Sequence, residues 1–249
     1  MGISNGATPT VRKHRSTTPL SAALPEFHPE APRPDFTWTV HLPSSWHLLE
    51  THPDLALEST ATLANASLAH TTMEEQQRTL VLRHLEETIT QAQNLRVLMA
   101  MVLPQWDKDE FQTGFVVLRW VDSFPMYASV SSTQQQLEAF DPKVKLTDAG
   151  GYFVALSRSY LGNDPAHPDR MHYSHQAFVP LPGTTWTLVV SGSAPTSSLS
   201  AIVEHMVQRI AASLRAYSDP KKDWTRFSPR QTQDGTFPIE VTWEGAYRL

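Results

Sequence analysis

Residues 185–217 of the chain read TWTLVVSGSAPTSSLSAIVEHMVQRIAASLRAY, and this stretch decides the fold. It opens with an apolar, β-branched run over 185–191, which is typical of a buried strand. After Pro195, either Ser197 or Ser198 can cap the first turn of a helix. The spacing then predicts a long amphipathic helix, 199–217, that packs on a sheet. Its apolar residues recur every three or four positions: Leu199, Ile202, Val203, Met206, Ile210, Leu214 and Tyr217.

Further strands are predicted before this stretch. Residues 36–42 alternate between apolar and polar, which is the period of a strand with one buried face. Residues 97–103 are apolar without a break, which indicates a central strand buried on both faces. Residues 122–125 and 180–183 carry the turn-forming residues that join neighbouring strands. The other predicted strands are 113–121, 126–131, 150–158 and 172–179.

Three more helical segments are predicted between the strands. Residues 55–68 are rich in Ala, Leu and Thr, and residues 134–140 suit a short helical turn. A stronger helix begins near Thr71 or Thr72, because each has a Glu three residues on and can open a capping box. An apolar stripe follows over 80–95, so this helix packs its apolar face on something flat.

This order of elements predicts an α+β fold, a mostly antiparallel β-sheet flanked by amphipathic helices. No regular alternation of strand and helix supports a doubly wound parallel sheet. Residues 1–34 are rich in proline and poor in periodic apolar residues, which predicts a disordered leader. Residues 35–249 are expected to form a single domain. Within it, residues 219–249 are an extension that carries an edge strand.

Composition narrows the range of functions. The chain has 249 residues, a formal net charge of -5 and no cysteine. The acidic balance argues against a general nucleic-acid binder, which would need a basic face. The lack of cysteine removes disulfides, thiolate catalysis and cysteine-based zinc sites. No apolar run approaches the roughly 18 residues of a membrane span, and no secretory signal is seen, so we expect a soluble cytoplasmic protein.

Motifs of common catalytic and cofactor sites are also missing. The sequence has no Gly-x-Gly-x-x-Gly, no phosphate loop and no His-Glu-x-x-His. Gly192 and Ser193 lack the second glycine of a nucleophile elbow. We therefore predict no cofactor and no catalytic residue.

Two short motifs carry a resemblance to a known family. Leu42-Pro43-Ser44-Ser45-Trp46 ends a strand, and Ser193-Ala194-Pro195 leads from a late strand into the long C-terminal helix. Over residues 36–217 the chain resembles the PsbP/Mog1/LpqN-like superfamily. It is most similar to uncharacterised actinobacterial proteins, some of them found near type VII secretion genes. The resemblance implies an α/β/α sandwich around an antiparallel sheet. It also implies a non-enzymatic protein that assists assemblies or binds partner proteins, with no catalytic residue to carry over.

One polar cluster offers an alternative function. His167, Asp169, His172 and His175 are ligand types that zinc accepts, which makes them candidates for a metal or acid–base site in the loop 161–175. If 172–179 is a strand, however, His172 and His175 point to opposite faces. The pattern favours a solvated loop. A small-molecule or metal-binding protein, or an enzyme, that uses this loop is the alternative hypothesis.

The favoured hypothesis is a protein-binding or accessory protein, with a link to a secretion or other multiprotein machine. Tryptophans near loops and strand ends are candidate contact residues, since Trp is frequent at interaction hot spots. The strand at 237–243 is a second candidate, because Pro238 suggests an edge that could accept a partner's strand. The predicted protein-binding residues are Trp46, Trp106, Trp120, Phe237, Ile239 and Val241.

Overall fold

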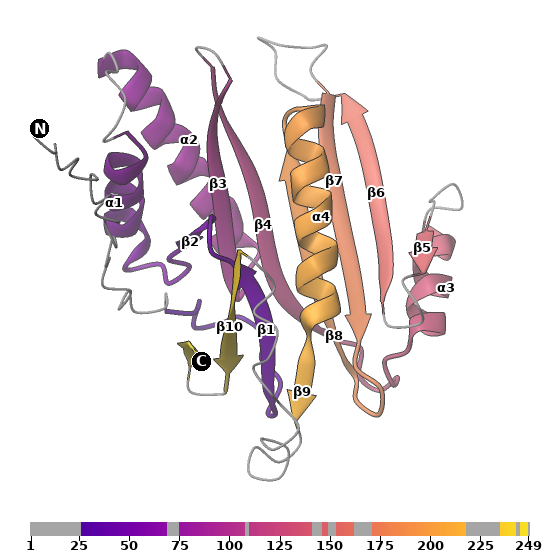
Figure 1. The fold of residues 1–249 in the computed structure, drawn as a ribbon. Helices are drawn as coiled ribbons and strands as arrows, with labels where there is room; N and C mark the ends of the chain where they lie inside the picture. The colour runs from indigo at the N-terminus through magenta and orange to yellow at the C-terminus, as the bar shows by residue number, and fades with distance from the viewer. Residues whose placement is uncertain are drawn as a thin grey trace, which may run out of the picture.

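The largest element of the fold is an antiparallel sheet of seven strands. The computed structural model describes residues 26–68, 75–107, 110–140, 146–148, 153–161, 171–217, 235–242 and 245–248. The strands of this sheet are β2 (His47–Leu49), β3 (Met99–Asp107), β4 (Glu110–Asp122), β5 (Leu146–Asp148), β6 (Val154–Leu161), β7 (Met171–Pro180) and β8 (Trp186–Ala194). Their order in space is β2-β3-β4-β8-β7-β6-β5, and every neighbouring pair is antiparallel (Figure 1).

A second sheet has four strands that come from distant parts of the chain. They are β1 (Thr37–Pro43), β9 (Arg215–Tyr217), β10 (Thr236–Val241) and β11 (Ala246–Arg248). Their order is β11-β10-β1-β9. Trp38 of β1 is paired with Ala216 on one side and with Val241 on the other. The sequence predicted one sheet, and the structure has two because β1 pairs with the C-terminal strands instead of with β2 or β3.

Helices cover both faces of the large sheet. They are α1 (Ala56–Leu68), α2 (Glu75–Asn94), α3 (Val130–Phe140) and α4 (Ser197–Ser213). Helix α4 packs on β4, β7 and β8 and also contacts β1 of the small sheet (Figure 1). Helices α1 and α2 share a hydrophobic core with the opposite face of β3 and β4. The predicted α+β class, a mostly antiparallel sheet flanked by helices, is confirmed. Within the described part of the chain, no helix is both long and apolar enough to cross a membrane.

The first four residues of β3 are buried on both faces, as the unbroken apolar run indicated. Met99 and Met101 pack in the core that contains α4 and the small sheet. Ala100 and Val102, the alternate residues, pack in the core that contains α1 and α2. None of the four side chains is more than 6% exposed. Alternation along a strand sends successive side chains to opposite faces, so one short run serves two cores.

Tryptophan side chains hold the two sheets together. Trp120 of β4 is 1% exposed and makes edge-to-face contacts with three other rings. The ring centroids lie 5.7 Å away for Phe36, 5.3 Å for Trp38 and 6.4 Å for Trp186. This geometry suits the quadrupoles of aromatic rings and buries a large apolar area. Trp120 therefore joins β4 and β8 of the large sheet to β1 of the small one.

Gly192 lets α4 lie close to the large sheet. A Cβ atom at this position would lie 2.4 Å from Val203 Cγ1 and 2.8 Å from Val207 Cγ2, both on α4. A Cβ atom at Gly114 of β4 would meet Val203 Cγ2 at 3.1 Å. Because a side chain at Gly192 has no room, its place in the sequence reflects helix–sheet packing.

The C-terminal end of α4 differs from the prediction. The helix stops at Ser213 and not at Tyr217, and residues 215–217 form β9. Ser213 Oγ donates to Ile210 O at 2.7 Å and accepts from the His41 backbone N–H at 2.9 Å. Leu214 then turns out of the helix with φ -58° and ψ 131°. Residues 215–217 therefore pair with β1 as a strand, although the spacing of Leu214 and Tyr217 suits a continued helix.

The predicted cap of α4 is wrong as well. The residue before the helix is Thr196, in an extended conformation, and its side chain caps no backbone N–H. Its hydroxyl bonds Gln112 Oε1 at 3.1 Å, which ties the start of α4 to β4. The capping box predicted at Thr71 or Thr72 lies outside the described residues.

The predicted domain boundary between residues 34 and 35 lies too late in the chain. Phe27 and Ala31 are 8% and 6% exposed and belong to the core beneath α4. The His28 backbone N–H donates to Thr51 Oγ1 at 3.2 Å, and Glu30 forms an ion pair with Arg96 at 3.2 Å. Prolines in this segment prevent a helix but do not prevent packing. Residues 1–25 lie outside the described part of the chain.

Candidate protein-binding site

Most of the residues predicted to bind a partner are buried in the core. The exposed fractions are 6% for Trp46, 1% for Trp120, 0% for Ile239 and 1% for Val241. Phe237 is half-buried and packs against the same core. The prediction was therefore wrong for the four buried residues, because their side chains belong to the hydrophobic core. The side chain of Trp106 is outside the described part of the structure, so its role stays a prediction.

Strand β10 does not offer the free edge that was predicted for 237–243. It pairs with β1 along its whole length and with β11 over Ile239–Val241. Pro238 lies before the first residue of β10 that pairs with β11, and among the described strands it is paired with β1 alone. Proline cannot donate to a ladder, so its position agrees with the point where β11 pairing ends. A partner's strand cannot add to β10 where β11 already lies.

The structure separates the predicted metal ligands. His167 and Asp169 lie outside the described residues, so a site in the loop 161–175 stays a prediction. His172 and His175 stand three positions apart on β7 and point to opposite faces. The His172 ring stacks on Tyr160 of β6, with centroids 6.0 Å apart. Among the described residues, no group of three or more acidic or histidine side chains could hold a metal ion.

His175 lies under α4 in a small polar network. It is 5% exposed. Its Nε2 is 2.8 Å from Ser200 Oγ, and its Nδ1 is 2.8 Å from Ser157 Oγ. Ser157 Oγ also donates to Glu204 Oε1 at 3.0 Å. If Ser157 donates to Glu204, it accepts from Nδ1–H, and Nε2 then accepts from Ser200. The network therefore satisfies a buried neutral imidazole. Ser200 is 8% exposed and lies between α4 and the sheet, so a substrate could not reach its hydroxyl.

This network predicts a dependence of stability on pH. Burial lowers the pKa of His175, and the Glu204 carboxylate raises it by a smaller amount. The folded pKa is therefore below the unfolded value of about 6.5, so the unfolded chain binds the proton first. The free energy of unfolding should fall as the pH drops below about 6.5.

The contribution of His175 can be isolated by urea unfolding between pH 7.5 and 5. The variant His175→Gln should show a shallower fall than the wild type, because one buried imidazole no longer titrates. Ile202→Ala, at a position on α4 that is 40% exposed and outside the network, should retain the wild-type slope. Equal slopes for His175→Gln and the wild type would contradict the assignment.

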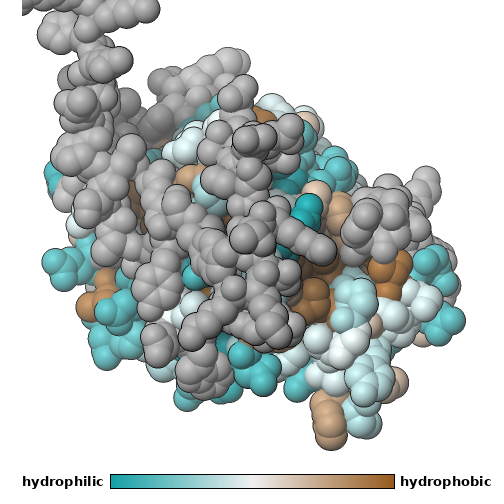
Figure 2. Space-filling view, turned by 60° about the horizontal axis from the view of Figure 1, so that its bottom comes forward, coloured by the Kyte–Doolittle hydropathy of each residue, from teal (hydrophilic) through white to brown (hydrophobic). Residues whose placement is uncertain are grey.

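A loop between β4 and α3 presents the largest group of exposed apolar side chains close together in the described sequence. We name residues 123–128 the aromatic loop. Phe124 is 79% exposed, Met126 55% and Tyr127 72%. Single exposed apolar residues are common on protein surfaces, but three within four positions form a patch. Figure 2 looks onto the end of the molecule where β4 ends, and it shows hydrophobic surface between hydrophilic residues.

Hydrogen bonds to the turn between β7 and β8 hold the aromatic loop in place. The Ser123 N–H donates to Thr185 O at 2.8 Å, and the Ala128 N–H donates to Thr184 O at 2.7 Å. Ser123 Oγ lies 2.8 Å from Thr185 O and 2.9 Å from Met126 O.

Asp122 strengthens the same link. Its Oδ1 accepts from the Phe124 N–H at 3.0 Å and from the Thr185 hydroxyl. The backbone of the aromatic loop is thus tied at both ends while its large side chains face solvent.

The sequence pattern did not indicate this site, because residues 126–131 were predicted to form a strand. Met126, Ala128 and Val130 alternate with Tyr127, Ser129 and Ser131, so the period of two is present. In the structure Ala128 is buried and α3 begins at Val130. The available signal was Ser129, whose hydroxyl accepts from the Ser132 N–H at 3.1 Å and caps α3. A serine cap at that position ends a strand and starts a helix.

Comparison with known proteins adds similarities at low identity. No protein-family model matches the chain, and no curated protein matches it. Among solved structures, the chain is similar to the Ran-binding protein Mog1p of Saccharomyces cerevisiae, at 14% identity and a TM-score of 0.34. That match covers 50% of this chain and 83% of Mog1p.

A second solved structure covers more of this chain. LpqN of Mycobacterium tuberculosis, which is involved in cell envelope biogenesis, is similar at 12% identity with a TM-score of 0.39. The match covers 74% of this chain and 86% of LpqN. At these values the role of this chain has to be inferred from its own surface.

Proposed function

We propose that this chain is a non-enzymatic accessory protein that binds another protein through its aromatic loop. The observation that carries this proposal is the exposure of Phe124, Met126 and Tyr127 on a backbone tied down by hydrogen bonds. The partner is a protein with an apolar pocket that can take these side chains. It belongs to a secretion or other multiprotein machine, as the sequence resemblance implies.

The hydrogen bonds that hold the aromatic loop favour binding, because its backbone loses less conformational entropy when a partner associates. Ordering a flexible, rotamer-rich side chain at an interface costs about 0.5–1.5 kcal/mol. The bonds from Ser123 and Ala128 to the β7–β8 turn place the backbone of the loop before a partner arrives. Aromatic side chains bury a large area and are frequent among hot-spot residues. Phe124 and Tyr127 are therefore expected to supply most of the binding free energy.

The expected result is a partner whose capture depends on these two side chains. The full chain, tagged and immobilised, should retain one stoichiometric protein from a lysate of the source organism. The double variant Phe124→Ser and Tyr127→Ser should weaken the affinity for that purified partner at least a hundredfold, since a hot-spot residue contributes about 2 kcal/mol or more. Titration calorimetry with the purified partner measures the change.

A matched control separates specific contact from general loss of apolar surface. Phe140 is 86% exposed at the end of α3, outside the aromatic loop. Phe140→Ser should bind as tightly as the wild type. The proposal fails if the double variant and Phe140→Ser hold the partner with equal affinity, or if no protein is held by the wild type.

A further inference from the structure

A second surface feature lies at the C-terminal end of α4. It is a groove of about 710 Å³ between this helix, β9 and the turn that follows β7. Its apolar lining includes Phe153, Leu181 and Leu214. Its polar lining includes His205, Arg209 and Arg215, and none of the described residues that line it is acidic. The volume is within the range of small-molecule sites, about 300–1,000 Å³.

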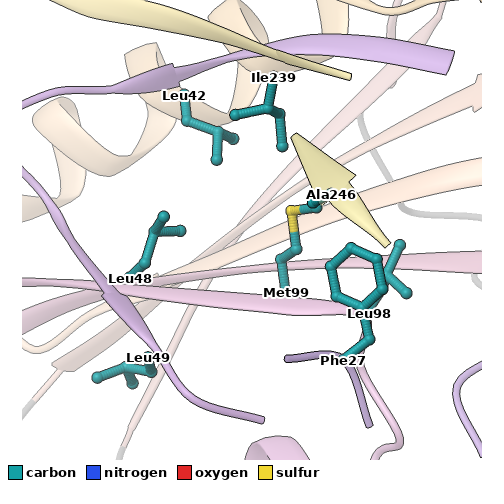
Figure 3. A pocket seen from close by; sticks show the side chains of 8 residues that line it. All are labelled: Phe27, Leu42, Leu48, Leu49, Leu98, Met99, Ile239 and Ala246. Atoms are coloured by element: carbon teal, nitrogen blue, oxygen red, sulfur yellow. The ribbon is translucent and has the colours of Figure 1, made fainter. Parts of the chain in front are cut away.

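An interior cavity between the two sheets offers a contrast. It is lined by apolar side chains, among them Phe27, Leu42 and Met99, and it measures about 10 Å³ (Figure 3). A space of that size holds about one water molecule. The cavity is a packing defect, and the groove at the end of α4 has room for a ligand.

The groove carries positive charge in a chain whose net charge is -5. Arg209 and Arg215 both line it. The positive charge also affects the nearby His41. Burial is the main cause of its lowered pKa, and the charges of Arg215 and Arg209 lower it further. An anion placed here is attracted by the same field that disfavours a protonated imidazole.

The C-terminus of a helix normally disfavours a bound anion, but Arg215 offsets this effect at the end of α4. Carbonyl groups at that end carry partial negative charge and repel anions. Arg215 Nη1 donates to Ala212 O at 3.1 Å and to Leu214 O at 2.6 Å, so these two carbonyls already have a cationic partner. Both of these bonds are made by Nη1 of Arg215.

We propose that this groove binds an organic anion with an apolar body, a carboxylate, sulfonate or phosphate attached to an aromatic or aliphatic group. Arg209, Arg215 and His205 hold the anionic group, because guanidinium groups form strong charge-assisted hydrogen bonds to such oxygens. Phe153, Leu181 and Leu214 contact the apolar body. This site is separate from the aromatic loop and does not depend on the proposed protein partner.

A pair of matched probes tests both halves of the proposal with the full chain. The first probe is 8-anilinonaphthalene-1-sulfonate, and the second is N-phenyl-1-naphthylamine, which has the same rings without the sulfonate. Fluorescence titration should give saturable binding of the sulfonate at one site. The uncharged probe should bind at least tenfold more weakly.

Variants locate the site. Arg209→Gln should weaken the sulfonate at least tenfold, and His205→Gln should weaken it by a smaller factor. Arg83→Gln removes the same charge from α2, where Arg83 pairs with Glu87, and should bind like the wild type. Thermal melting of each variant checks that it is folded, because loosely packed states also bind this dye.

Two results would overturn the proposal. One is equal binding of the sulfonate by Arg209→Gln, His205→Gln and Arg83→Gln, all of them folded. The other is equal binding of both probes by the wild type, which would show that the anionic group contributes nothing. Neither result bears on capture of a protein by the aromatic loop, so failure here and failure there are distinct.

Discussion

Trp120→Ala should destabilise the protein by about 3–5 kcal/mol, the cost of truncating a buried tryptophan. Trp120 is 1% exposed and touches the rings of Phe36, Trp38 and Trp186. Removing it leaves a cavity at the junction of the two sheets, which neither sheet can close without moving its neighbours. Urea unfolding followed by far-ultraviolet circular dichroism measures the change in the free energy of unfolding.

Two further variants provide comparisons for the loss of stability expected in Trp120→Ala. Trp120 Nε1 has no hydrogen-bond partner among the described residues, so Trp120→Phe gives up no such bond to them and keeps one ring. We expect it to cost less than half as much as the alanine variant. Val121→Ala, at a neighbouring position that is 39% exposed, should change stability by less than about 0.5 kcal/mol. A small effect of Trp120→Ala, close to that of Val121→Ala, would show that the ring cluster does not join the sheets.

Gly192→Ala should destabilise by about 1–3 kcal/mol or more, as overpacking does in a dense core. The added Cβ would lie 2.4 Å from Val203 Cγ1 and 2.8 Å from Val207 Cγ2. Valine is stiff at χ1, so these methyl groups cannot swing away, and α4 must move off the sheet. Urea unfolding again gives the change in the free energy of unfolding.

A double-mutant cycle tests the cause. Val203→Ala removes the nearer methyl group, so Gly192→Ala should cost less in its presence than in the wild type, with a coupling of about 0.5 kcal/mol or more. Gly114→Ala, whose Cβ would be 3.1 Å from Val203 Cγ2, should cost less than Gly192→Ala. Strict additivity of Gly192→Ala and Val203→Ala would mean that the clash is relieved elsewhere.

Local sequence patterns predicted the elements whose own residues decide their structure. The helix at 55–68 and the strand pair joined by 180–183 follow from periodicity and turn chemistry. Elements that depend on a distant partner were mispredicted. Leu214 and Tyr217 fit a helical stripe, but residues 215–217 pair with β1. No local signal contains that pairing, because β1 lies near the other end of the chain.

Side-chain exposure at the candidate site likewise depends on distant contacts. Burial of Trp46 and Ile239 depends on how two sheets meet, and no single segment encodes that contact. The exposure of Met126 and Tyr127 depends on bonds from the aromatic loop to Thr184 and Thr185, residues far along the chain. The sequence identifies large side chains as candidate contact residues, but their solvent exposure depends on the assembled fold.

The small sheet has a consequence for the order of events during synthesis. Strand β1 is made before every strand of the large sheet, and its partners β9 and β10 are made after all of them. Ribosomes add about 5–20 residues per second, so on the order of ten to forty seconds pass before Trp38 can meet Val241. During that interval the apolar face of β1 and both of its edges are unpaired, which is the state in which nascent chains aggregate. A chaperone that shields the nascent N-terminal segment should therefore raise the yield of folded protein, and a truncation before β10 should remain dependent on it.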